Sequence, residues 1–259
     1  MAKKLKTKSD QKLFLLTNDD GYTAPGLKAL NREIRKLGEV IVVAPDREQS
    51  ASSHSLTLQR PLRINNYSNE HYSVDGTPTD SIMIAVHALL KGRKPDFIIA
   101  GVNHGPNMGH DVTYSGTVAA AIEGSILGIP SFAVSLADWD VDDYVPAARA
   151  VRKIVRQFED WPFPEFTFLN INIPYLGRKP YKGAKITKLG KRVYDDIIVE
   201  KTDPRGKHYY WIGGEPEWFE IEGSDFSAVN AGYISITPLA VDMTSHSTYR
   251  EFSDIKIKV

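Results

Sequence analysis

The chain has 259 residues, 42% of them hydrophobic, and it contains no cysteine. Its 32 Lys and Arg residues balance 32 Asp and Glu residues, so no net charge attracts it to a nucleic acid duplex or an anionic membrane. The lack of cysteine excludes disulfides, thiolate nucleophiles and Cys-based zinc sites. No apolar run approaches the length of about 20 residues that a membrane-spanning helix needs. We therefore expect one large domain, or one and a half, with a small-molecule partner.

The start of the chain is rich in lysine and lacks the apolar core of a signal peptide. We expect residues 1–12 to form a disordered lead-in and the protein to lie in the cytoplasm. Apolar strand-like runs and amphipathic helices alternate after it, and we expect residues 13–180 to form one α/β domain with a parallel sheet.

Two adjacent carboxylates follow the first apolar run. Residues 13–17 read as a strand buried on both faces, and Asp19, Asp20 and Gly21 come directly after it. Ligands in α/β sheets bind beyond the carboxyl ends of such strands, and a hard divalent cation is the usual reason to crowd two like charges. An Asp-Asp-Gly turn without a bound ligand is the alternative.

Polar loops also follow the next two strands. Residues 27–37 have helical spacing, residues 39–43 form a second apolar strand, and the tract from Ser50 to Thr57 contains five hydroxyl residues and one histidine. Residues 97–100 form a third strand, which leads to Asn103. Because parallel strands end at one edge, these loops should meet the two carboxylates and offer an all-oxygen site suited to Mg²⁺ or Mn²⁺. A solvated loop is the alternative for the hydroxyl-rich tract.

A helix that begins near Ser115, Gly116 and Thr117 is a candidate anion site. Its first N–H groups lack helical partners and lie beside two hydroxyls, which favours a phosphate; a simple Ser or Thr cap explains only one of the hydroxyls. Beyond it we expect a strand at 131–136, a helix at 144–158 and a last core strand at 166–171.

After residue 180 the pattern changes to short strand-like runs with five aromatic residues between Tyr209 and Phe219. We expect residues 181–259 to form a β-rich extension and tail. Aromatic strands of this kind favour oligomerisation, and packing back onto the first domain is the alternative.

Five blocks of the sequence, in order, resemble the survival protein SurE family. They are Thr17–Tyr22 with Ala24-Pro25-Gly26, Val43–Ser50, Val74–Pro78, Gly101-Val102-Asn103 with Gly105, and Tyr114–Thr117. The resemblance runs from about residue 13 to Thr237-Pro238-Leu239. It implies a Rossmann-like parallel sheet flanked by helices, with a β-rich C-terminal extension exchanged between the subunits of a homodimer or homotetramer.

The resemblance also implies an activity and a set of site residues. The family consists of metal-dependent nucleotidases and acid phosphatases that act on nucleoside 5′- and 3′-monophosphates and, in some members, on short polyphosphate. One divalent ion per subunit, Mn²⁺ or Mg²⁺, would be held by Asp19, Asp20, Ser50 and Asn103. The phosphate would be bound by Asn107, Ser115, Gly116 and Thr117. His104 and His110 stand where relatives often carry other residue types.

The mechanism that follows is hydrolysis by an activated water whose proton passes to Asp19 or Asp20. The acid for the leaving group stays open among His54, His104, His110, Asp111 and bulk water. One alternative makes Asp19 the nucleophile of an aspartyl-phosphate intermediate, although the spacing differs from the Asp-x-Asp-x-Thr pattern of such phosphatases. Another alternative is a nucleotide-binding sensor without turnover.

Overall fold

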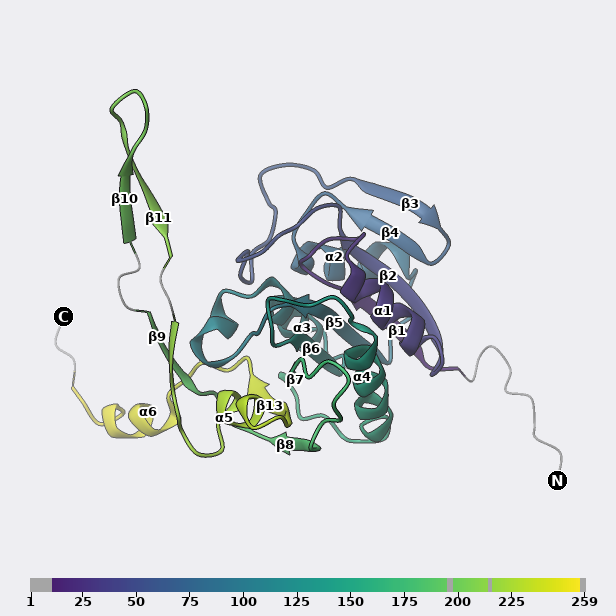
Figure 1. Cartoon of the computed structure of the whole chain (residues 1–259). Helices are drawn as coiled ribbons and strands as arrows, with labels where there is room; N and C mark the ends of the chain where they lie inside the picture. Colours follow the sequence, from purple (N-terminus) through teal and green to yellow (C-terminus); the bar gives the residue numbers. More distant parts are fainter. Residues whose placement is uncertain (1–10, 195–197, 214–215, 257–259) are drawn as a thin grey trace.

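The computed structural model of the chain describes residues 11–194, 198–213 and 216–256 (Figure 1). The expected lead-in at residues 1–12 therefore lies, apart from its last two residues, outside the described part. Within that part, every helix is too short or too polar to cross a membrane.

A nine-stranded sheet forms the centre of the molecule, in the order β3-β4-β2-β1-β5-β6-β7-β13-β8. Neighbours from β4 to β7 pair in parallel, so the carboxyl ends of these six strands meet at one edge. The predicted α/β fold with a parallel sheet is confirmed. The strands are β1 (Leu13–Thr17), β2 (Glu39–Pro45), β3 (Ile64–Ser68), β4 (His71–Val74), β5 (Phe97–His104), β6 (Ser131–Leu136), β7 (Thr167–Ile173), β8 (Ala184–Ile186) and β13 (Ile234–Ala240).

Helices cover both faces of this sheet, which explains why β1 is apolar at every position. Phe14 and Leu16 pack on the side of α1 (Pro25–Ile34) and α4 (Val145–Gln157). Leu13 and Leu15 pack on the opposite side, which is covered by α2 (Pro78–Ile84), its π-helical continuation η2 (Ala85–Leu89) and α3 (Gly116–Ile126).

The expectation that residues 166–171 form the last core strand is wrong, because β13 and β8 extend the sheet beyond β7. β13 runs antiparallel to β7, and β8 runs parallel to β13. Ile234 and Ile236 of β13 are buried in the same cluster as α1 and α4. Apolar side chains near the end of the chain thus complete a core that the first part leaves open.

The remaining elements lie around the sheet. A two-stranded ribbon of β9 (Lys191–Tyr194) and β12 (Pro216–Phe219) leads to a hairpin of β10 (Ile198–Thr202) and β11 (His208–Ile212). This hairpin projects away from the body of the molecule (Figure 1), and both of its strands are exposed along their length. A 3₁₀ turn, η3 (Gly109–Thr113), precedes α3, and the short helices α5 (Asp225–Asn230) and α6 (His246–Phe252) come before and after β13 in the chain.

Asp225 ties the C-terminal part of the chain to the loop that precedes α3. Its carboxylate is fully buried and accepts hydrogen bonds from the backbone N–H groups of Gly109 and Gly190, each at 2.8 Å, and from that of Phe226. Three segments far apart in sequence therefore converge on one side chain.

We predict that Asp225→Ala lowers the free energy of unfolding by about 3 kcal/mol or more, because two buried N–H groups and a partly buried one lose their acceptor. Asp225→Asn keeps one acceptor oxygen and should cost less. Urea unfolding followed by circular dichroism measures both variants. An Asp225→Ala midpoint equal to that of the wild type would contradict this role.

Candidate active site at the carboxyl edge of the sheet

Asp19 lies against the first turn of α3. Its side chain is almost completely buried, and the Thr117 N–H donates to Oδ2 at 3.0 Å while the Thr117 hydroxyl donates to Oδ1. Burial raises the pKa of Asp19, and the hydrogen bonds from Thr117 oppose this rise. The helix start that was predicted to bind an anion thus binds a carboxylate of the protein itself.

Gly116 permits this close approach. A Cβ atom at that position would lie 2.9 Å from Cβ of Asp19 and 2.7 Å from Oγ of Ser52. Both distances are shorter than real carbon contacts allow, so any larger residue would move the helix away from Asp19. The close approach of α3 to Asp19 therefore requires glycine at position 116.

Asp20 shares the same edge and carries an unusual pKa. The His104 N–H donates to its Oδ2 at 3.2 Å. Burial, followed by the negative charges of Asp19 and Glu48, raises the pKa of Asp20 from 3.8 to about 7, against the lowering effect of the His104 hydrogen bond. Two carboxylates in this position repel each other, and a cation between them would relieve the repulsion.

Asn103 completes a set of three oxygen-bearing side chains. It follows a shift in register between β5 and β6, and its side-chain N–H₂ donates to the carbonyl oxygens of Gly105 at 2.9 Å and His104 at 3.2 Å. Its Oδ1 lies 3.5 Å from the Thr117 hydroxyl, which also contacts Asp19. One hydroxyl thus has both Asp19 and Asn103 as neighbours.

The hydroxyl-rich tract after β2 is anchored to the site, which disfavours the alternative of a solvated loop. Gln49 donates its N–H to the backbone oxygen of Asp19 at 2.8 Å, and the Ser53 hydroxyl donates to the carbonyl of Thr113. Ser50 is exposed and its hydroxyl donates to Glu48 Oε1 at 2.7 Å. Ser50 therefore belongs to the loop that borders the site, with its hydroxyl turned toward Glu48.

Ser52 is a residue that the sequence did not single out. Its Oγ is buried, has no hydrogen-bond partner among the described residues, and lies beside the position where Gly116 approaches Asp19. Asn18 Oδ1 is a second buried oxygen without a partner, although its side-chain N–H₂ donates to Gly21. The only signal for Ser52 was its place among five hydroxyl residues.

The proposed phosphate residues differ in their surroundings. Ser115 caps α3, because its Oγ accepts from the Val118 N–H at 3.1 Å, and its own proton stays available to a further acceptor. The side-chain N–H₂ of Asn107 donates to the hydroxyl of Ser135, and the backbone carbonyl oxygen of Asn107 accepts from the side chains of Asn170 and Asn172. Asn107 is thus fixed by β6 and β7 at the same edge.

Three of the four side chains considered as the acid have partners. His54 contacts Glu123 of α3 at 2.9 Å, which holds the hydroxyl-rich tract in place. Asp111 pairs with Arg192 of β9. The backbone N–H of His104 donates to Asp20, and Nδ1 of its ring lies 2.8 Å from the Tyr144 hydroxyl. His104 thus contacts Asp20 through its backbone and Tyr144 through its ring. His110 is exposed.

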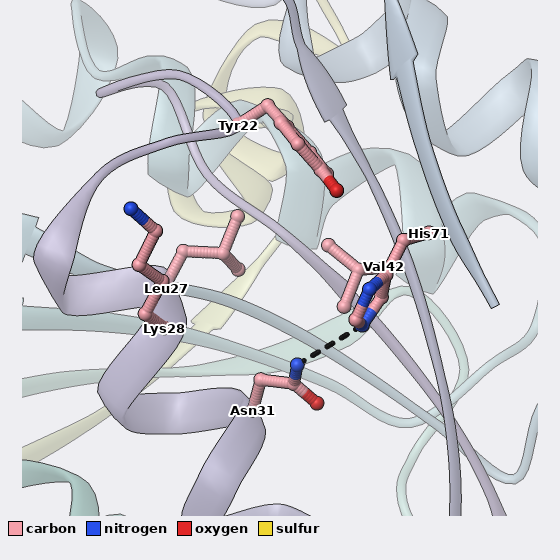
Figure 2. Close-up of a pocket in the computed structure, with 6 residues that line it drawn as sticks. All are labelled: Tyr22, Leu27, Lys28, Asn31, Val42 and His71. Carbon is pink, nitrogen blue, oxygen red and sulfur yellow. Dashed lines mark hydrogen bonds between the residues drawn. The ribbon is translucent and has the colours of Figure 1, made fainter. Parts of the chain in front are cut away.

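A small hollow lies between α1 and the strands β2 and β4 (Figure 2). Tyr22, two positions after Asp20 in the chain, forms part of its wall. Its walls combine apolar and polar side chains, namely Tyr22, Leu27, Lys28, Asn31, Val42 and His71. Asn31 donates to His71 at 3.1 Å and accepts from Arg35 at 2.9 Å, so the amide at the base of the hollow is already paired. The Tyr22 ring stacks on Tyr67 at 4.5 Å.

The donor set at Asp19 fits a hard divalent cation better than zinc. No group of three or more His, Cys, Asp or Glu side chains with metal-binding geometry occurs in the described part of the chain. The site offers two carboxylates and an amide oxygen, with the hydroxyl of Ser50 on the adjacent loop, and Mg²⁺ and Mn²⁺ prefer such oxygen ligands. Burial raises the pKa of Asp20 and repulsion by Asp19 adds to the rise, which is a further reason for a cation there.

Known proteins match the chain over most of its length. A model of the survival protein SurE family matches residues 14–196. A "5′-nucleotidase SurE" of Pelobacter propionicus is 49% identical over 239 residues, which cover 92% of this chain and 96% of that protein. A protein of the same name from Geotalea uraniireducens is 50% identical over 237 residues, covering 91% and 95%. The crystal structure of the SurE protein from Aquifex aeolicus matches with a TM-score of 0.85 at 43% identity, covering 93% and 98%.

Without divalent cations, we predict that the protein loses stability as the pH rises through 7. The folded state raises the pKa of Asp20 from 3.8 to about 7. The stability that neutral Asp20 has over its ionised form is therefore fully present below about pH 4 and is lost as the pH rises to 7. Asp20→Asn cannot titrate and should lack this part of the slope, which is at most about 1.4 kcal/mol per pH unit. Urea unfolding in EDTA at pH 5 and pH 8 compares the two proteins. Equal pH dependence in both would contradict the assignment.

Proposed function

The chain belongs to the survival protein SurE family, and we infer from this membership and from the site that it is a 5′-nucleotidase, a phosphomonoesterase acting on nucleoside 5′-monophosphates. The observation that carries the inference is the convergence of Asp19 and Asn103 on Thr117 in the first turn of α3, with Asp20 held next to Asn103 by the N–H of His104. We extend the proposal to 3′-monophosphates and short polyphosphate, which share the terminal phosphate group.

We propose that one Mn²⁺ or Mg²⁺ ion per subunit is held by Asp19, Asp20, Ser50 and Asn103. When bound, such an ion would add positive charge beside the phosphate and lower the pKa of an attacking water. Thr117 and Gly116 keep the Asp19 carboxylate in one orientation before any ligand arrives. Ser50 must turn its hydroxyl from Glu48 toward the carboxylates to join the set.

We propose that the phosphate lies beside the start of α3, in reach of Asn107, Ser115, Gly116 and Thr117. Ser115 has a proton to donate, since its oxygen already accepts from the helix. Thr117 would donate its hydroxyl to the phosphate, and in the structure that hydroxyl donates to Asp19 and lies 3.5 Å from Oδ1 of Asn103. The positive end of the helix dipole adds a favourable field for an anion.

Asp20 is the better candidate to accept the proton of the attacking water. Both oxygens of Asp19 are engaged by Thr117, whereas the described contacts of Asp20 involve only Oδ2, with the His104 N–H. The same difference disfavours the aspartyl-phosphate mechanism, because a carboxylate held by two donors at a helix start is a weakened nucleophile. A sensor without turnover would bind nucleotide and release no phosphate.

A phosphate-release assay with a nucleoside 5′-monophosphate and Mn²⁺ tests the proposal. We predict that Asp19→Asn and Asp20→Asn keep the fold but lose roughly 10³-fold in turnover, because a charged ligand contributes several kcal/mol to transition-state stabilisation. EDTA should inactivate the wild type, and Mn²⁺ or Mg²⁺ should restore it. Binding of nucleotide without phosphate release would favour the sensor. Substantial activity of either variant at saturating Mn²⁺ would refute the ligand assignment.

We also propose that the chain forms a homodimer or homotetramer through residues 181–259. The β10–β11 hairpin supports this, because cross-strand pairs place Ile198 with Ile212 on one face and Val199 with Trp211 on the other, and all four are exposed in the single chain. Apolar surface of this kind on both faces of a projecting hairpin favours burial by a second copy.

We predict that the double variant Val199→Ser, Trp211→Ser lowers the molecular mass in solution, because it removes apolar surface from one face of the hairpin. Sedimentation equilibrium measures the mass. Leu58→Ser, at a residue 81% exposed outside the hairpin, serves as the control. A wild-type monomer, or a double variant with the wild-type mass, would contradict the proposal.

A further inference from the structure

The rim of the site carries an exposed tryptophan whose position suggests a role in substrate recognition. Trp139 follows β6 at the same edge as Asp19 and Asp20, and 66% of it is exposed to solvent. Single exposed aromatic side chains are common on protein surfaces, so the position of Trp139 beside the carboxylates carries the argument, and its exposure leaves the ring accessible. We propose that the Trp139 indole is the surface on which the base of the nucleoside monophosphate stacks, an inference that rests on the proposed function.

Trp139 is connected to the carboxylates through two residues. The His104 N–H donates to Asp20, and the His104 ring lies 5.6 Å from the Trp139 ring in an edge-to-face arrangement. Gly105 lies directly under the indole, because a Cβ atom on Gly105 would approach the six-membered ring to 2.3 Å. The indole therefore packs on the backbone of Gly105, two residues after the metal-ligand candidate Asn103.

The support beneath this surface is rigid. The N–H groups of Gly105 and Asp138 both donate to the carbonyl oxygen of Leu136. Gly105, beneath the indole, and Asp138, next to Trp139 in the chain, are therefore both tied to the end of β6. Tyr144 is buried in the core and fixes the His104 ring from the other side. An aromatic ring held this way loses little freedom when a flat base stacks on it.

The chemistry of the substrate suits such a surface. The phosphate is bound by charged and polar groups, whereas every nucleobase offers a π-face whose stacking tolerates different base types. The hollow at Tyr22 is less suited, because its amide is paired with His71 and Arg35 and its tyrosine is already stacked on Tyr67. A single open indole predicts a nucleotidase with weak preference among bases.

The test compares two substrates that differ only by the base. Trp139→Leu should raise KM for adenosine 5′-monophosphate roughly tenfold, in line with the loss of one base–aromatic stack. It should leave kcat and KM for ribose 5-phosphate unchanged, because that ester has the same phosphate and pentose but no base. Trp139→Phe keeps a ring and should restore most of the affinity. Circular dichroism confirms that each variant is folded.

Trp161→Leu provides the matched control. Trp161 is 62% exposed, but it follows α4 at the opposite edge of the sheet, and its ring lies edge-to-face with that of Phe158. Both KM values should stay at the wild-type level in this variant. Adenosine should also quench the tryptophan fluorescence of the wild type and of Trp161→Leu, and should quench Trp139→Leu much less.

The outcomes separate the two proposals. If the wild type hydrolyses neither substrate, the proposed function is wrong, and adenosine quenching then decides the stacking surface by itself. If Trp139→Leu impairs both substrates equally, Trp139 supports the loop structure and the inference is overturned. It is also overturned if Tyr22→Leu, and not Trp139→Leu, raises KM for the nucleotide alone, or if Trp139→Leu changes only the molecular mass in solution.

Discussion

The hydrogen-bonded contact between Asp19 and the start of α3 is the interaction on which the rest of the site depends. It joins the end of a central strand to a helix on one face of the sheet, across 98 positions of sequence. A carboxylate buried this deeply would be costly to ionise without donors, and the backbone and hydroxyl of Thr117 supply them. The contact requires a residue without a side chain at position 116, so one glycine sets how closely strand and helix can approach.

The same contact leaves the neighbouring carboxylate in an unfavourable position. Asp20 is partly buried beside Asp19 and receives one described hydrogen bond, from His104, so burial and repulsion together raise its pKa to about 7. A side chain selected for stability alone would be neutral here. Asp20 therefore destabilises the folded state, as is common for residues that serve function, here holding a cation and accepting a proton.

The sequence predicts the strands and their common edge, because apolar runs such as 13–17 and 97–100 are short, continuous and followed by polar loops. For that reason the meeting of Asp19 and Asn103 could be foreseen. The pairing of β13 with β7 could not, since strand order depends on contacts between residues far apart in sequence. The sequence pattern also does not show that Thr117 already binds Asp19, or that Ser52 and Trp139 lie at the site, because each depends on how loops fold over the sheet edge.

The site therefore has an inner and an outer part with different physical requirements. The inner part places charged groups within hydrogen-bonding distance of a helix start, so a shift of a few tenths of an ångström there changes both the pKa values and the geometry of any bound phosphate. The outer part, where Trp139 rests on Gly105, acts by apolar contact that tolerates small displacements. Because the described contacts between the two parts run through residues 103–105, the residue at position 139 can change the affinity for one substrate over another while the groups around Asp19 stay in place.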